Sequence, residues 1–154
     1  MVLYVFAVLI GVVAGLRAMT APAAVSWAAH LGWIDAGDGW MSFMANSAAP
    51  WVFTILAAIE LATDKLPQTP SRKVPIQFAT RIITGALCGA TLCAASDALV
   101  AGAVAGAIGA IAGTLGGAEL RARLAAGIGR DWPAALIEDA IAILGAIALV
   151  TLLP

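Results

Sequence analysis

The sequence is poor in charge. Its 154 residues include 8 Lys and Arg and 9 Asp and Glu residues, so that 11% are charged, 62% are hydrophobic and the mean hydropathy is +1.00. Soluble globular domains contain about 25% charged and about 45–50% apolar residues. This shortage of charge excludes an ordinary soluble domain and predicts an integral membrane protein.

Basic clusters, aromatic residues and metal ligands are scarce as well. The net charge is −1 and 6% of the residues are aromatic, which excludes a basic, aromatic surface for nucleic acid. His30 is the single histidine, and the sequence has no CxxC or HxxxH spacing, so we expect no metal site and no cofactor. Cys88 and Cys93 fall in one predicted helix and are expected to be buried thiols rather than a disulfide.

Apolar segments of transmembrane length fill most of the chain. We predict five spans, over residues 3–29, 50–63, 75–95, 99–118 and 132–153. The segment between the first two spans carries Trp33, Trp40 and Phe43 and is expected to lie in the membrane interface. The predicted fold is therefore an all-α five-helix bundle, with residues 1–154 forming a single transmembrane domain.

Lys and Arg residues gather in alternate connections. The connection after the second span contains Lys65, Arg72 and Lys73, and the one after the fourth contains Arg121, Arg123 and Arg130. The connections after the first and third spans contain none. Because basic loops stay in the cytoplasm, five spans place the N-terminus in the cytoplasm and the C-terminus outside.

Two pairs of segments suggest an internal repeat. Residues 10–15 (IGVVAG) resemble residues 108–113 (IGAIAG), and residues 57–60 (AAIE) resemble residues 135–138 (ALIE). Spans one and two would then be related to spans four and five by an inverted repeat, as in many secondary transporters. The alternative is accidental similarity between helices rich in Ala, Gly and Ile, whose glycines serve close helix packing.

Polar side chains inside the predicted spans are the candidate functional groups, because a charge in the bilayer is costly and usually faces the bundle interior. These candidates for substrate binding or a proton pathway are Arg17, Thr20, Glu60, Asp64, Arg81, Glu138 and Asp139. We predict no catalytic residues among them, since the only histidine lies far from the hydroxyl-rich connection between spans two and three.

Depth along the helices predicts how these charges pair. At a rise of about 1.5 Å per residue, Arg17 and Glu60 lie at similar depths and are expected to form one pair. Arg81 is expected to pair with Glu138 or Asp139. Asp64 lies one turn from Glu60 and can join either pair.

Pro22 should kink or break the first helix five residues after Arg17, because proline removes a backbone donor. The hydroxyl of Thr20 can then bind a ligand or the backbone that the break sets free.

The connection TDKLPQTPSR is a second candidate site. Its polar side chains can bind the phosphate of a lipid headgroup at the membrane surface, with Lys65, Thr69, Ser71 and Arg72 as the contacting residues. The alternative is an ordinary polar turn whose basic residues only anchor the topology.

The segments GLRAMTAPAAVSWAA and ELATDKLPQTPSR, followed by Arg81 in an apolar span and by a Gly-rich span, resemble a family of small bacterial integral-membrane proteins that is catalogued as a domain of unknown function. The resemblance covers most of the chain. It implies one multi-pass domain in the bacterial inner membrane, and it brings no activity, cofactor or catalytic residue.

The leading functional hypothesis is a small transporter, flippase or channel for an anionic small molecule or a lipid phosphate. Arginine forks suit such anions, and the neighbouring carboxylates can exchange protons. We expect membrane lipids as partners and a homo-oligomer, because five thin helices leave little room for a solvated path. The alternatives are a membrane-embedded lipid-phosphate enzyme and a non-catalytic assembly protein whose ion pairs only fix helix register.

Overall fold

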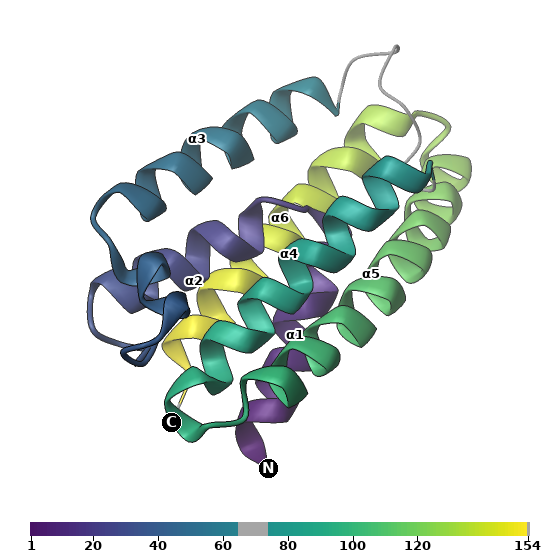
Figure 1. Ribbon diagram of the computed structural model, residues 1–154. Helices are drawn as coiled ribbons and strands as arrows, with labels where there is room; N and C mark the ends of the chain where they lie inside the picture. The colour runs from purple at the N-terminus through teal and green to yellow at the C-terminus, as the bar shows by residue number, and fades with distance from the viewer. Residues whose placement is uncertain (65–73, 154) are drawn as a thin grey trace.

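The computed structural model describes residues 1–64 and 74–153, and all its regular elements in these ranges are helical (Figure 1). They are α1 (Val2–Leu16), α2 (Thr20–His30), η1 (Trp40–Ala45), α3 (Ala48–Thr63), α4 (Pro75–Cys93), η2 (Ala94–Ser96), α5 (Leu99–Ile128) and α6 (Asp131–Thr151). Three helical segments, namely α4 with η2, α5 and α6, are long and apolar enough to cross a membrane. The predicted all-α fold is confirmed, whereas the predicted count of five helices is not.

The first predicted span is two helices rather than one. α1 ends at Leu16, Arg17 is extended at φ −139° and ψ 112°, and α2 begins at Thr20. Pro22 lies in the first turn of α2, where its missing N–H has no helical acceptor and therefore causes no break. The break thus precedes Pro22 and falls at the buried arginine.

After this break the chain turns back. Leu3 near the start of α1 lines a cavity of about 150 Å³ together with Trp33 and Ile34, which follow α2, and with Leu153 near the end of the chain. Both termini lie at this end of the bundle (Figure 1). The predicted topology, with the termini on opposite sides, is therefore wrong, because α1 and α2 form a hairpin instead of one span.

The two ends of the bundle differ in charge. The end that holds the termini also holds residues 31–47 and the turn between α4 and α5, which carry Asp35, Asp38 and Asp97 and no Lys or Arg. The opposite end holds the end of α5 and its connection to α6, a stretch that carries Arg121, Arg123 and Arg130 (Figure 1). We call these the acidic end and the basic end.

α5 is about ten residues longer than the predicted fourth span. Hydropathy falls at Glu119, but the Ala, Leu, Arg and Glu residues that follow are strong helix formers and continue the helix. It ends at Gly129, whose φ of +77° is the left-handed C-cap conformation that glycine adopts readily. Because of this extension Arg121 lies on α5, where its side chain contacts Asp131 and Glu138 of α6.

Glycines bring α1 and α5 into backbone contact. An added Cβ at Gly109 would overlap the carbonyl oxygen of Val8, and one at Gly113 would overlap that of Val12. Higher numbers in α1 therefore meet higher numbers in α5, so the two helices run parallel. This contradicts the inverted repeat, which requires the first and fourth spans to run in opposite directions. The similar hexapeptides instead form the two sides of one interface.

Glycines also bring α4 into close contact with α5. Gly85 and Gly89 of α4 pack against the backbone of α5 at Gly106 and Gly102, so these two helices run antiparallel. Cys88 and Cys93 are buried free thiols, which confirms that prediction.

Residues 31–47 fold as an amphipathic segment. In η1, Met41 and Met44 are buried, whereas Trp40 and Phe43 are exposed and stacked with ring centroids 6.4 Å apart. Trp51 at the start of α3 is also exposed, and its ring lies edge-on to that of Trp27, with centroids 5.2 Å apart. This arrangement is the one expected of a segment at a membrane interface.

Candidate functional site

Arg17 lies in the turn between α1 and α2, and its side chain is completely buried. Its Nη1 donates a hydrogen bond to Oδ2 of Asp64, which caps the C-terminal end of α3. Its Nη2 lies 2.5 Å from Oδ1 of Asp139 on α6. A single buried cation thus joins the α1–α2 turn to α3 and α6.

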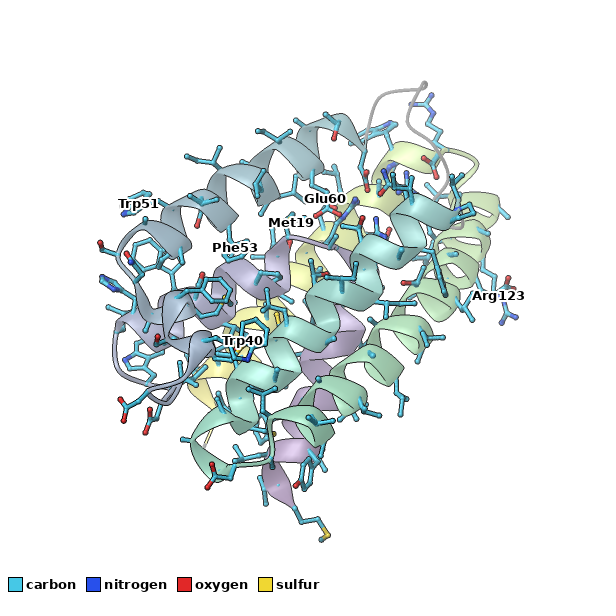
Figure 2. All side chains as sticks on the ribbon, viewed as in Figure 1. Met19, Trp40, Trp51, Phe53, Glu60 and Arg123 are labelled. Atoms are coloured by element: carbon cyan, nitrogen blue, oxygen red, sulfur yellow. The ribbon has the colours of Figure 1, made fainter. Side chains whose placement is uncertain are left out.

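Glu60 of α3 reaches the other side of the same turn (Figure 2). Its Oε1 accepts a hydrogen bond from the N–H of Ala18, and its Oε2 accepts one from the N–H of Met19, each at 2.8 Å. These N–H groups immediately precede α2, where the positive end of the helix dipole favours a carboxylate. Glu60 therefore acts as an N-terminal cap supplied by another helix.

Arg81 of α4 supplies the opposite cap. Its Nη1 donates to the carbonyl oxygens of Gly15 at 3.1 Å and Leu16 at 2.6 Å, which are the last two residues of α1. Carbonyls at a helix C-terminus have no acceptor role within the helix, and a cation satisfies them well. Nη2 of Arg81 also lies 3.4 Å from Oε1 of Glu60, so the two caps pair with each other.

The structure brings the predicted charges together but exchanges their partners. Arg17 pairs with Asp64 and Asp139 instead of Glu60, and Glu60 pairs with Arg81. The depth estimate placed the start of the first span at the basic end, whereas α1 starts at the acidic end. Arg17 therefore lies about 22 Å from the acidic end. Its contact with Asp139 places it level with the third turn of α6.

Glu138 belongs to a neighbouring cluster that the sequence did not reveal. Arg121 of α5 donates hydrogen bonds to Asp131 at 3.0 and 2.6 Å, and its Nη1 lies 3.6 Å from Oε2 of Glu138. Hydropathy ends the predicted fourth span at Ala118 and therefore predicts that Arg121 lies in a connection. The helix-forming residues after Glu119 were the signal that could have placed it on α5.

Some buried polar atoms at the break make no hydrogen bond within the described part of the chain. They include Nε and Nη2 of Arg17 and the hydroxyl oxygen of Thr20, a residue that is 7% exposed. Buried polar groups are nearly always satisfied, so each exception needs an explanation. The prediction that Thr20 binds backbone freed by Pro22 finds no such bond among the described residues.

Two other candidate regions lie away from this turn or outside the described residues. Lys65, Thr69, Ser71 and Arg72, the predicted headgroup-binding residues, fall outside the described ranges. A cavity of about 560 Å³ opens at the acidic end and is lined in part by Asp35, Asp38 and Asp97. Residues 1–64 and 74–153 contain no group of three or more His, Cys, Asp or Glu side chains arranged to hold a metal ion.

The comparisons with known proteins place the chain in a family. The family model described as a domain of unknown function, DUF4126, matches residues 5–153. No curated protein and no solved structure matches the chain. The chain therefore belongs to the DUF4126 family, and its function has to be argued from its own residues.

Proposed function

We propose that this member of the DUF4126 family is a small membrane transporter for an anionic group, a phosphate or a carboxylate, and that it moves each anion together with a proton. The substrate site is the α1–α2 turn, with Arg17 as the anion-binding residue. Placement in the bacterial inner membrane, with the basic end in the cytoplasm and both termini outside, follows from the positive-inside rule and is part of the proposal.

The observation that carries the proposal is the Nε–Nη2 edge of the Arg17 guanidinium, on which Nε has no partner among the described residues and Nη2 is held by the ion pair with Asp139. Nε and Nη2 form the edge that binds carboxylate or phosphate through two parallel hydrogen bonds. Both atoms are buried without a hydrogen bond to any described residue, although Nη2 has the charge of Asp139 beside it. The Thr20 hydroxyl, in the same state, is available as a third contact for the anion.

The helix ends at the α1–α2 turn also favour the binding of an anion. α2 points its positive end at the turn, where Glu60 now provides the negative charge. Discontinuous helices in transporters use such ends to hold the charged groups of the substrate. A substrate anion can replace Glu60 there while it binds Nε of Arg17 and takes the place of Asp139 at Nη2.

Charge balance then requires a proton. The two carboxylates of Asp64 and Asp139 already exceed the single positive charge of Arg17 in the absence of substrate. A further anion would add another uncompensated negative charge in a medium of low dielectric constant, which is strongly unfavourable. If Asp64 or Asp139 takes up a proton as the anion binds, the net charge of the site is unchanged.

The test is transport by purified protein in liposomes, with inorganic phosphate, acetate and a fluorescent phospholipid as separate probes. We expect uptake or flipping of at least one probe, stimulated by a proton gradient, and a loss of about 100-fold or more in Arg17→Gln. Arg17→Lys keeps the charge but not the fork, so it should also be impaired. The control is Glu119→Gln, because Glu119 forms an exposed pair with Arg123 on the outer face of α5 (Figure 2).

Folded wild-type protein that moves none of the three probes, or an Arg17→Gln variant that is as active as the wild type, would refute the proposal. A phospholipid signal alone would identify a flippase, and a phosphate or acetate signal alone a carrier of soluble anions. The predicted homo-oligomer is a separate expectation, which the size of the active complex in liposomes tests.

A non-catalytic role remains the second candidate, and one observation favours it. Glu60 and Arg81 satisfy both helix ends at the break without any ligand. If the charges only hold the turn in place, the triple variant Arg17→Met, Asp64→Asn, Asp139→Asn should fold and keep the protein's cellular role. The rival enzyme has its proposed residues mainly within positions 65–73, which lie outside the described ranges.

A further inference from the structure

α3 is the least enclosed of the helices that meet at the α1–α2 turn. It packs against α2 and η1 and lies at the edge of the bundle (Figure 1). Only Pro50 and Ala57 of its 16 residues are buried. The packed side of α3 is one narrow stripe, whose members are three or four residues apart, namely Pro50, Phe53, Ala57, Glu60 and Asp64. The two carboxylates that reach the turn are thus the last members of this stripe.

The site is most accessible beside α3. The side chains of Glu60 and Asp64 are 13% and 16% exposed, compared with 0% for Arg17. On the side of α5 the turn is closed by backbone contact, since a Cβ added at Gly15 would overlap the carbonyl oxygen of Ala110. Within the described part of the chain, a ligand therefore has its nearest approach to Arg17 beside α3.

An exposed apolar row leads away from Glu60 along the same helix. Leu56 and Val52 lie four and eight residues before Glu60, so the three side chains follow one line along α3. Leu56 is 39% exposed and Val52 is 52% exposed. Because α3 begins beside η1 at the acidic end, this line runs from Glu60 toward the middle of the membrane. We call Val52 and Leu56 the α3 row.

The depth of the site fits a lipid headgroup. α4 runs antiparallel to α5 and therefore starts at the basic end. Arg81, which caps α1 beside Arg17, lies six residues after Pro75 and hence about 9 Å from the start of α4. The hydrocarbon core is about 30 Å thick, so a phosphate from the nearer leaflet descends fewer than about two helical turns to reach the site. The acyl chains of such a lipid then lie alongside the α3 row.

We propose that the anion is the phosphate of a phospholipid, which enters the site sideways from the bilayer past α3 while its acyl chains stay against the α3 row. This inference rests on the proposed function and narrows its substrate class to lipid phosphates. The phosphate supplies acceptors for Nε of Arg17 and for the hydroxyl of Thr20, which are buried without a hydrogen bond to a described residue. A free phosphate shares this chemistry but has no part that contacts the α3 row.

The first experiment is photo-crosslinking in proteoliposomes, with phosphatidylglycerol that carries a diazirine in one acyl chain. We expect label on α3 at or beside Val52 and Leu56. Diacylglycerol with the same diazirine chain lacks the phosphate and should label α3 about tenfold less. Arg17→Gln changes no residue of α3, and it should reduce the label from phosphatidylglycerol to the level given by diacylglycerol.

The second experiment compares two probes of transport: phosphatidylglycerol with a fluorophore on one acyl chain, and glycerol phosphate, which has no acyl chains. We expect the lipid to flip and glycerol phosphate to move no faster than in empty liposomes. The double variant Val52→Asn, Leu56→Asn should slow flipping about tenfold, because an acyl chain that packs on an amide strips it of water. The control Val104→Asn, Ile111→Asn places the same amides on α5, at positions 54% and 38% exposed, and should leave flipping unchanged.

Transport of glycerol phosphate or inorganic phosphate without flipping of phosphatidylglycerol would overturn the inference and leave the anion transporter in place. Equal effects of the α3 and α5 double variants, or equal label on α3 from phosphatidylglycerol and diacylglycerol, would also overturn it. Folded wild-type protein that moves none of these probes would refute the proposed function, and this inference with it.

Discussion

Arg81 and Glu60 hold the two ends of a single helix break. The guanidinium of Arg81 donates to the last carbonyls of α1, the carboxylate of Glu60 accepts from the N–H groups that precede α2, and the two side chains lie 3.4 Å apart. The backbone groups that the break leaves unpaired are thus satisfied by charges from α4 and α3. Each charge has its ideal place at a helix end of the opposite sign.

This relationship predicts strong coupling between the two residues. Arg81→Met leaves Glu60 buried without that cation and leaves the carbonyls of α1 uncapped, which should lower the free energy of unfolding in detergent by about 3–5 kcal/mol. Glu60→Gln should weaken the same turn. Because each single change removes the same interaction, the double variant should cost about 1–3 kcal/mol less than the sum.

The matched control for this cycle is the exposed pair formed by Glu119 and Arg123. It has the same charges on a solvated helix face, so its removal should change stability by about 1 kcal/mol or less. Additive effects of Arg81→Met and Glu60→Gln would show that the two caps act independently and would contradict the proposed coupling.

The sequence predicted the spans better than their connections. Hydropathy located each boundary of α3, α4 and α6 to within two residues. It could do so because a membrane helix requires an apolar segment of a certain length. It did not reveal that α1 and α2 form a hairpin, because both halves are apolar and Arg17 can be buried in either arrangement. Whether α2 turns back toward the start of α1 or continues in the direction of α1 depends on tertiary contacts.

For the candidate site, too, the sequence predicted the residues better than their contacts. Residue type and depth correctly selected Arg17, Glu60 and Asp139 as interior charges, since burial of charge is costly wherever it occurs. Their partners depend on helix direction, which followed from the wrong topology. The capping role of Arg81 was also out of reach, because its acceptors are backbone atoms that become available only when α1 ends at Leu16.

The glycine contacts of α5 predict a position-dependent response to a single methyl group. In Gly109→Ala the new Cβ would overlap the backbone carbonyl of Val8, so the helices must separate. We expect the free energy of unfolding in detergent to fall by about 1–3 kcal/mol. Gly116→Ala on the same helix meets no atom within 4 Å and should be neutral or stabilising by up to about 1 kcal/mol. Equal effects at the two positions would contradict the close packing.

The two cysteines should be unreactive in the folded protein. Cys88 and Cys93 are 0% and 1% exposed, so a reagent dissolved in water does not reach either sulfur atom. A polar maleimide should therefore label neither in mild detergent, and both after denaturation. Ser96→Cys, three residues beyond Cys93 and exposed at the acidic end, is the positive control. Rapid labelling of Cys88 in folded protein would indicate that α4 separates from its neighbours.

The α1–α2 hairpin predicts that both ends of the chain lie on one side of the membrane, and the unreactive native cysteines make this testable. A cysteine added before Met1 and the variant Leu152→Cys should both react with a membrane-impermeant maleimide applied to intact cells, since both positions lie at the acidic end (Figure 1). Gly127→Cys, near the basic end of α5, should react only after the membrane is opened. If the N-terminal cysteine behaved like Gly127→Cys, α1 and α2 would have to cross the membrane as one broken helix. The turn at Arg17 would then not return the chain to its starting side, and the contacts of Glu60 and Arg81 would need a different geometry.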